Sequence, residues 1–287
     1  MDHHKKGGLV MDLIGNAKRV PIREEDKAKS YYHFYERELA PVPENKIAII
    51  QDMYGQPGEP LEIEDRNKIF EPGYLPDDFG GIRALKAGGY VLSNNTKFEG
   101  CTGEMLQWYF GWHALDPFRY SIWDPYDHYG LTITEEERKK ILEAPTLLKK
   151  CQGVDHIVLE SLIPGTDPAT LIIGFRDPVE LGYDGSKIGT EACSFIVTAN
   201  VQICTPDGKF PVVMLHMARD IEGGCELRSR FWFGYQIENG KGICKAPAEL
   251  IEELKPALEA LQRHNFFEFT QLADILPTLY AEEKDCW

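Results

Sequence analysis

Apolar positions recur at helical spacing near the C-terminal end of the chain. Steps of three and four residues place one line of side chains on a single helix face. Residues four apart lie one above the other on a helix, so His264 and Glu268 can reach the same ligand. We therefore predict a long helix over 254–279 whose inward stripe carries an ionisable pair: Leu254, Leu258, Leu261, His264, Glu268, Leu272, Ile275 and Leu279.

The pair has two interpretations. An isolated HxxxE match is more often an intrahelical ion pair than a metal site, because short motifs match by chance. Its position favours the metal, since a charged Glu268 in an inward stripe is costly unless it is paired or bound to a cation. The rest of the chain must then supply further ligands.

The second half of the chain alternates in a way that predicts an antiparallel sheet. The turn sequences TPDG at 205–208 and EGG at 222–224 separate the last three candidate strands, which should form a meander. The strand over 212–219 is apolar on both faces, so we expect one face to be covered and the other to enclose something. The four candidate strands are Val154–Ile163, Ala192–Cys204, Val212–Arg219 and Glu226–Ile237.

Mixed elements precede this sheet. We predict a strand over Tyr90–Phe98 and an apolar helix over Thr102–Leu115 that Thr102 caps. The segment 119–123 is strand-like, and the capping box TEEE at 134–137 begins another helix.

The N-terminal part is expected to be helical. A helix is predicted over 22–39, with acidic residues in its first turn, and a short helix over 65–70. Proline and glycine residues between them forbid long elements, and the turn-rich sequence EPGYLPDDFGG begins at Glu71. We expect a helical N-terminal domain with its linker at 1–83 and the main domain at 84–287.

Together these elements predict an α+β protein. A curved antiparallel sheet around a long C-terminal helix, with helices inserted after the first strand, resembles the helix-grip architecture of the Bet v 1 and START-like proteins. This fold analogy alone implies a cavity and no particular function.

Composition excludes several classes of partner. The chain has 287 residues and a formal charge of −15, which argues against nucleic acid and anionic membrane surfaces as partners. Seven scattered cysteines without a CxxC motif suggest free thiols in the cytoplasm and argue against a cysteine-held zinc. The apolar run Gly8–Gly15 is short and broken by Asp12, so we expect neither a signal peptide nor a membrane span there. His3 and His4 lie in a polar start.

Further candidate ligands lie outside the C-terminal helix. His128 lies in the proline-containing sequence DPYDHYG, where we expect a loop. Glu160 shares strand parity with His156 and Val158 on a mainly apolar face, although a glutamate on an edge strand facing water is equally consistent. Tyr120 can donate a hydrogen bond into a pocket or belong to the core. His216 is more simply a buried, satisfied histidine, with a substrate contact left open.

Several motifs resemble the family of 2,4-diacetylphloroglucinol hydrolase and phloretin hydrolase. The resemblance covers most of the chain from about residue 60. The motifs are IEDRN and EPGYLP, the run from Gly103 to Gly130, and HIVLESL, RSRFWFGY and HNFFEFTQLADILPTLY.

The resemblance implies a Bet v 1-like domain after a helical N-terminal domain, one zinc ion per chain and a homodimer. It carries the zinc ligands onto His128, Glu160, His264 and Glu268, the four positions already singled out. Mn²⁺, Fe²⁺ and Co²⁺ also suit these ligand types.

Further residues of the pocket follow from the same resemblance. It carries pocket tyrosines onto Tyr120 and Tyr235, and a pocket histidine onto His216. Thr132 stands where the family's pocket asparagine is expected.

The resemblance also implies the reaction, which is hydrolysis of the carbon–carbon bond between a phloroglucinol-type ring and its acyl group. The substrate would be an acylated polyphenol such as phloretin or a diacylated ring, and the abundant thiols favour flavonoid degradation. Two alternatives remain: a non-catalytic binder of a hydrophobic small molecule on the same fold, and a polyketide cyclase-like enzyme. A pure carrier does not need two carboxylates facing an apolar cavity.

Overall fold

The computed structural model describes residues 13–287. His3, His4 and the first part of the run Gly8–Gly15 lie outside the described residues. Within the described part, none of the helices combines the length and the apolar character that crossing a bilayer requires.

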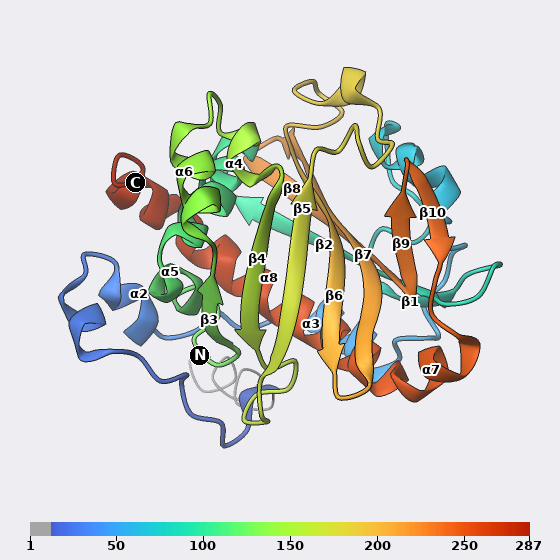
Figure 1. The fold of residues 1–287 in the computed structure, drawn as a ribbon, viewed down its shortest axis with the longest axis horizontal. Helices are drawn as coiled ribbons and strands as arrows, with labels where there is room; N and C mark the ends of the chain where they lie inside the picture. The colour runs from blue at the N-terminus through green and yellow to red at the C-terminus, as the bar shows by residue number, and fades with distance from the viewer. Residues whose placement is uncertain (1–12) are drawn as a thin grey trace.

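One large antiparallel sheet organises the molecule (Figure 1). Its strands lie in the order β1-β2-β8-β7-β6-β5-β4-β3, so β4 to β8 form a continuous meander and β2 pairs back onto β8. The strands are β1 (Gly81–Ala84), β2 (Tyr90–Glu99), β3 (His128–Thr132), β4 (Val154–Glu160), β5 (Ala169–Arg176), β6 (Phe195–Thr205), β7 (Gly208–Ile221) and β8 (Gly224–Phe233).

Helices cover this sheet, and β9 (Tyr235–Glu238) and β10 (Lys241–Cys244) form a separate two-stranded hairpin. In Figure 1 the long helix α8 runs behind β4, β5 and β6. The α-helices are α2 (Tyr32–Glu36), α3 (Glu44–Gln51), α4 (Gly103–Trp112), α5 (Pro117–Ser121), α6 (Glu135–Glu143), α7 (Ala248–Glu253) and α8 (Lys255–Glu283). Short 3-10 helices are η1 (Glu24–Ala28), η2 (Ile63–Phe70), η3 (His113–Leu115), η4 (Leu148–Cys151) and η5 (Gly185–Lys187).

Helix α8 confirms the predicted C-terminal helix. Pro256 lies in its first turn, where a proline leaves no hydrogen bond unmade. Leu258, Leu272 and Leu279 of the predicted stripe are fully buried. Burying a side chain of this kind contributes about 1.5–3 kcal/mol, so the stripe fixes which face of α8 meets the sheet.

The sheet is buried on both faces around β7 and β8, where two apolar clusters cover it, whereas Ile157 and Leu159 of β4 are exposed on the outer face. On β8, Leu227 and Phe231 face the cluster shared with α8, whereas Trp232 belongs to the cluster shared with η2 on the outer face. This explains why the predicted strands read as apolar at consecutive positions.

These features confirm the predicted α+β helix-grip architecture of the Bet v 1-like type. The division into domains at 1–83 and 84–287 stays a prediction. Strand β1 spans the expected boundary and pairs with β2, and the N-terminal side chains Val20, Tyr31 and Phe34 belong to the same apolar cluster as α4.

Two local predictions were wrong at helices. The segment 119–123 is not a strand, because α5 begins at Pro117 after Asp116, whose carboxylate accepts a hydrogen bond from the Phe118 N–H at 2.9 Å. The predicted helix over 22–39 is two short helices, η1 and α2, because the backbone at Lys29 is extended.

Two local predictions were wrong at strands. The run 226–237 is not one strand, because Gly234 takes a φ of 91° and the chain leaves the sheet there. Strand β5 was not predicted, and His128 begins a strand where a loop was expected.

Candidate metal centre

Four predicted ligands meet at one end of the sheet. His128 begins β3, Glu160 ends β4, and these two residues are partners in the register of the two strands. His264 and Glu268 lie one turn apart on α8. All four side chains are buried, with exposed fractions of 0%, 5%, 3% and 6%.

The four functional groups face one another without direct hydrogen bonds. His128 Nε2 lies 3.6 Å from Oε2 of Glu160 and 3.6 Å from Oε2 of Glu268. His264 Nε2 lies 3.6 Å and 3.8 Å from the same two oxygens. These separations exceed hydrogen-bond length, so the atoms surround a common space.

The Nδ1 atom of each histidine contacts an oxygen on the side that faces away from the other ligands. His128 Nδ1 lies 3.2 Å from the Tyr120 carbonyl oxygen, and His264 Nδ1 lies 3.2 Å from Oδ2 of Asp127. When Nδ1 donates to these acceptors, Nε2 presents its lone pair. Within the described chain, His128 Nε2 is buried and has no hydrogen-bond partner. This pattern is typical of histidines that bind metals.

The two carboxylates are oriented as well. Glu160 Oε2 accepts a hydrogen bond from the Tyr120 hydroxyl at 2.7 Å, and the Tyr120 ring stacks on His128 with ring centroids 3.8 Å apart. Glu268 Oε1 accepts a hydrogen bond from Asn265 Nδ2 at 3.0 Å. The ligand cluster is therefore supported on every side.

The electrostatics of the cluster indicate a missing positive charge. Burial and the neighbouring Glu160 carboxylate raise the pKa of Glu268 to about 8. Burial alone would lower the pKa of His264, but Glu268, Asp127 and Glu160 raise it well above its usual value. Burial lowers the pKa of His128 to about 3. Two buried carboxylates therefore share a site that a divalent cation would stabilise.

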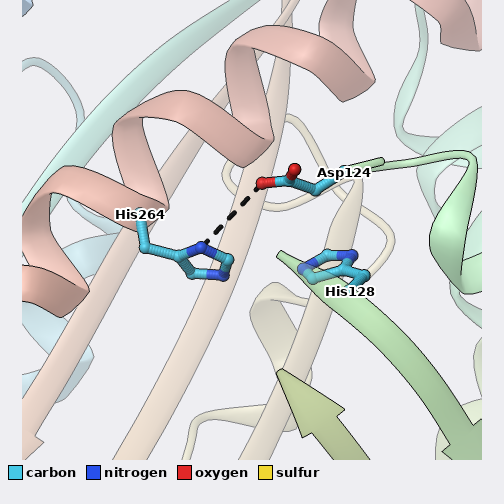
Figure 2. A group of neighbouring side chains, drawn as sticks. All are labelled: Asp124, His128 and His264. Atoms are coloured by element: carbon cyan, nitrogen blue, oxygen red, sulfur yellow. Dashed lines mark ion pairs between the residues drawn. The ribbon is translucent and has the colours of Figure 1, made fainter. Parts of the chain in front are cut away.

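A second grouping includes Asp124. One ligand atom from each of Asp124, His128 and His264 lies within 4.8 Å of the other two, so these residues could hold a metal ion. Figure 2 shows Asp124 beside one nitrogen of His264, whose other nitrogen is turned toward His128. Asp124 approaches Nδ1 of His264 at 3.9 Å, the nitrogen that Asp127 already holds. We therefore place Asp124 behind the histidine and the two glutamates in front of it.

The donor set fits zinc. Zinc binds histidine nitrogen and carboxylate oxygen at about 2.0–2.2 Å in tetrahedral sites, which places neighbouring ligand atoms about 3.3–3.6 Å apart. The nitrogen-to-oxygen separations here are 3.6–3.8 Å. The buried His128 nitrogen without a partner gives an independent reason for a cation at this position.

The ligand cluster opens onto an apolar cavity between the sheet and α8. The space between its walls, with the open solvent at its mouth included, measures about 700 Å³. The polar groups Tyr120 and His216 line it as predicted. Its apolar walls include Phe110, Leu171, Phe175, Val201, Met214 and Phe231.

The structure does not bring Tyr235 to the cavity. Tyr235 begins β9 and belongs to the outer apolar cluster, and its hydroxyl donates to the Gly88 carbonyl oxygen at 2.8 Å. The strand break at Gly234 separates it from Phe231, which does line the cavity. His216 is buried and its Nδ1 lies 2.8 Å from the Ser229 hydroxyl.

Sequence reasoning missed three groups around the site. His113 and His156 line the cavity beside Tyr120, and Asp127 supports His264. Burial lowers the pKa of His113 to about 4 and that of His156 well below its usual value, so both are neutral at pH 7. The inward parity of His156 was visible in the strand pattern, whereas the position of His113 at the end of α4 carried no signal.

Comparisons with known proteins identify the family of the chain. The family model described as "DAPG hydrolase PhiG domain" matches residues 61–281. The phloretin hydrolase of Eubacterium ramulus is 38% identical over 270 residues, which cover 93% of this chain and 95% of that protein. A 2,4-diacetylphloroglucinol hydrolase from a Pseudomonas species is 28% identical over 228 residues, which cover 77% of this chain and 76% of that protein.

Among solved structures, protein Ms6760 from Mycobacterium smegmatis covers 67% of this chain and 97% of its own, with a TM-score of 0.37 and 11% identity. A similarity of this size does not bear on function. The family match contains all four residues of the ligand cluster and spans well over half of the chain. The chain therefore belongs to the DAPG hydrolase family.

Proposed function

We propose that this chain is a zinc-dependent hydrolase that cleaves the carbon–carbon bond between a phloroglucinol-type ring and its acyl group. The names of its relatives, phloretin hydrolase and 2,4-diacetylphloroglucinol hydrolase, support the substrate class. The observation that carries the proposal is the convergence of two histidine nitrogens and two glutamate oxygens at the edge of an apolar cavity.

One zinc ion per chain would be held by His128, Glu160, His264 and Glu268. When bound, it would polarise the acyl carbonyl and make water acidic enough to react at neutral pH. The rest of the chemistry falls to the protein, which must bind the ring, exclude bulk water and supply protons at defined positions.

The reaction adds one water molecule. The ring carbon that carries the acyl group takes up a proton while a flanking phenol hydroxyl gives one up, the hydroxyl of water adds to the acyl carbonyl carbon, and the bond between these two carbons breaks. The electron pair returns to the ring, where the two flanking oxygens share the charge until one of them takes up the remaining proton of the water. The products are the phenol and a carboxylic acid. Groups that donate hydrogen bonds to those oxygens favour the step, because charge collects there.

Tyr120 is the proposed donor to a ring oxygen. Burial, together with the charges of Glu160 and Glu268, raises the pKa of Tyr120 well above its usual value, so the phenol remains protonated. Its hydroxyl lies against Glu160 Oε2, at the border between the ligand cluster and the cavity. A substrate oxygen beside Glu160 would come within its reach.

His216 is the proposed carrier of the proton to the ring carbon. Burial lowers the pKa of His216 to about 3, so the imidazole is neutral at pH 7 and can pass a proton between its two nitrogens. The Ser229 hydroxyl, 2.8 Å from Nδ1, extends this path to the neighbouring strand β8. Tyr235 has no part in the proposal, because its hydroxyl is engaged outside the cavity.

The substrate and the metal can be tested together. The purified chain is analysed for metal and incubated with phloretin and with 2,4-diacetylphloroglucinol, and the acid released is identified. We expect one equivalent of zinc and release of an arylpropanoic acid or of acetic acid. Glu268→Ala should lose both the zinc and the activity. A metal-free protein that is active, or a zinc-loaded one that only binds these compounds, would contradict the proposal.

Two further parts of the proposal concern assembly and location. We propose a homodimer, which a solution mass equal to one chain would refute. We also propose a cytoplasmic protein, supported by seven cysteines that form no disulfide among the described residues. The formal charge of −15 supports a small-molecule substrate over nucleic acid or an anionic membrane surface.

A further inference from the structure

A buried chain of hydrogen bonds leads from helix α3 to the ligand cluster. Lys46 Nζ donates to the side-chain oxygen of Asn94 and to the Asn95 carbonyl oxygen. Asn94 Nδ2 donates to Asn265 Oδ1 at 2.8 Å, and Asn265 Nδ2 donates to Glu268 Oε1 at 3.0 Å. Lys46 is 5% exposed and both asparagines of the chain are fully buried. The chain thus joins the N-terminal segment, the strand β2 and α8.

Lys46 fixes the direction of this hydrogen-bond chain. In its charged form the Lys46 amine has donors and no acceptor, so it holds the Asn94 oxygen toward itself and the Asn94 amide nitrogen toward Asn265. Asn265 then accepts with its oxygen and presents its own nitrogen to Glu268. If either amide alone were turned over, two nitrogens would face each other on one side and two oxygens on the other, so both of its hydrogen bonds in this chain would be lost.

This direction determines which glutamate oxygen is left for the ligand cluster. Oε1 of Glu268 accepts from Asn265, whereas Oε2 lies 3.6 Å and 3.8 Å from the Nε2 atoms of His128 and His264. We propose that Lys46 is a positioning residue of the metal centre, acting through Asn94 and Asn265 to hold Glu268 with Oε2 toward the metal. The inference rests on the proposed zinc site and goes beyond it, because it gives the N-terminal segment a part in the centre.

The surroundings of Lys46 argue against a purely structural role. A lysine buried among apolar side chains is costly, and Lys46 lies over the Phe266 ring with Nζ 4.5 Å from its centroid. Among residues 13–287 no carboxylate forms an ion pair with it, and burial lowers its pKa to about 7. A methionine would fill the same space at lower cost, so the selective value of the amine is its hydrogen bonds.

Zinc affinity measured by chelator competition tests the proposal. Lys46→Met removes the donor and keeps the length of the side chain. Ile49→Ala is the matched control, because Ile49 is a buried apolar residue of the same helix that packs near Phe266 and belongs to no hydrogen-bond chain. We expect zinc affinity to fall about tenfold in Lys46→Met, which is the smallest loss usual when a residue that supports a metal ligand is replaced. It should be unchanged in Ile49→Ala.

A second variant covers the case in which Lys46→Met does not fold. Asn94→Asp keeps the size of the side chain and gives Lys46 a counter-ion, but it can only accept hydrogen bonds. Asn265 must then turn its nitrogen toward Asp at position 94 and its oxygen toward Glu268. We expect a folded protein whose zinc affinity is about tenfold lower, and whose cobalt-substituted form has an altered absorption spectrum.

A double-mutant cycle separates a common path from two independent effects. Asn265→Ala should weaken zinc binding 10–100-fold, because Asn265 contacts Glu268 directly. Adding Lys46→Met to it should have no further effect, since both changes break the same chain.

The outcomes decide between the two proposals. Wild-type affinity in both Lys46→Met and Asn94→Asp, equal losses in Lys46→Met and Ile49→Ala, or additive losses in the cycle would each overturn the role of Lys46 while leaving the zinc hydrolase intact. A wild-type protein that binds no zinc would instead overturn the proposed function, and the role of Lys46 with it.

Discussion

Two buried groups of charged side chains lie on opposite faces of the sheet, and they solve the problem of burial differently. On the outer face, Arg230 Nη2 lies 2.8 Å from Asp77 and 2.7 Å from Asp78, and Arg228 Nη1 lies 3.1 Å from Asp78. We call these four residues the outer cluster. In the ligand cluster of His128, Glu160, His264 and Glu268, no nitrogen lies closer than 3.6 Å to a carboxylate oxygen of the cluster.

The difference follows from the cations involved. A guanidinium is always charged and reaches two carboxylates at hydrogen-bond distance, so the outer cluster closes on itself. An imidazole that is held from behind keeps its nitrogen at a fixed position and cannot close the gap to a glutamate. The outer cluster therefore ties the segment before β1 to β8, whereas the ligand cluster keeps a space of the size that a metal ion needs. We interpret the outer cluster, in which each carboxylate lies at hydrogen-bond distance from an arginine, as structural. We interpret the ligand cluster, in which no histidine nitrogen lies at hydrogen-bond distance from a carboxylate oxygen of the cluster, as functional.

The largest effect is expected from removing one charge of the ligand cluster. Glu268→Gln keeps the shape of the side chain and removes the anionic ligand, so the zinc should be lost and kcat/KM should fall by a factor on the order of 10³. Glu282→Gln, at an exposed position near the end of the same helix, is the control and should behave as wild type. Retention of zinc with full activity in Glu268→Gln would contradict a functional role for the ligand cluster.

The outer cluster should respond in stability and not in catalysis. Arg230→Met leaves the buried Asp77 without its cation and Asp78 with Arg228 alone, which should cost about 3–5 kcal/mol of unfolding free energy in urea titrations. Activity per folded molecule should not change. Lys97→Met, which removes an exposed ion pair with Glu99, should change stability by less than about 1 kcal/mol. Equal stability of the two variants would show that the outer cluster does not hold the fold.

The two clusters also differ in how far the sequence predicts them. The stripe on α8 predicts His264 and Glu268 as an inward pair, because helical periodicity over the 26 residues 254–279 leaves few alternative faces. Strand parity puts Glu160 on a mainly apolar face, although a glutamate on an edge strand facing water is equally consistent with it. The outer cluster gives no such signal, since Asp77 and Arg230 are far apart in the chain and no periodicity relates a turn-rich connection to a strand.

Predictions from local sequence failed at several positions, each for its own physical reason. The β-forming side chains of 119–123 predicted a strand, but a capping Asp116 and Pro117 begin a helix there. Lys46 was missed because a lone lysine in a short helix reads as solvent-exposed. Asn94 offered a usable signal, since it interrupts the inward parity of Leu92 and Phe98 in a strand that was predicted correctly.

Tyr120→Phe tests whether the Tyr120 hydroxyl, which donates a hydrogen bond to Glu160 of the ligand cluster, also takes part in the reaction. If the hydroxyl donates to a ring oxygen as charge develops, kcat should fall about 100-fold while substrate affinity changes less. Tyr109→Phe is the control, because it removes a buried hydroxyl that donates to the Arg119 carbonyl oxygen and does not line the cavity. An unchanged kcat in Tyr120→Phe would leave Tyr120 with a purely structural hydrogen bond to Glu160.

The pH dependence of zinc binding gives the smallest and most specific test of incomplete pairing. In the metal-free protein burial and Glu160 raise the pKa of Glu268 to about 8, so at pH 7 this carboxyl carries a proton that zinc must displace. His264, whose pKa is also raised, must lose its proton as well. Lowering the pH below 8 therefore makes protons compete more strongly with zinc for these ligands. Zinc affinity should fall at least tenfold per pH unit between pH 8 and pH 6.

Chelator competition across this range measures that slope, and a pH indicator in weak buffer measures the protons released. Above pH 8 the dependence should become shallower, because Glu268 is then ionised before zinc arrives and only the proton of His264 remains to be displaced. Arg230→Met should keep the same slope, since the outer cluster lies on the other face of the sheet and supplies no ligand to the metal. Zinc affinity that does not change between pH 6 and pH 8 would mean that the ligand cluster is fully ionised without its metal. The unpaired carboxylates and imidazoles of the ligand cluster would then not be the source of its affinity for zinc.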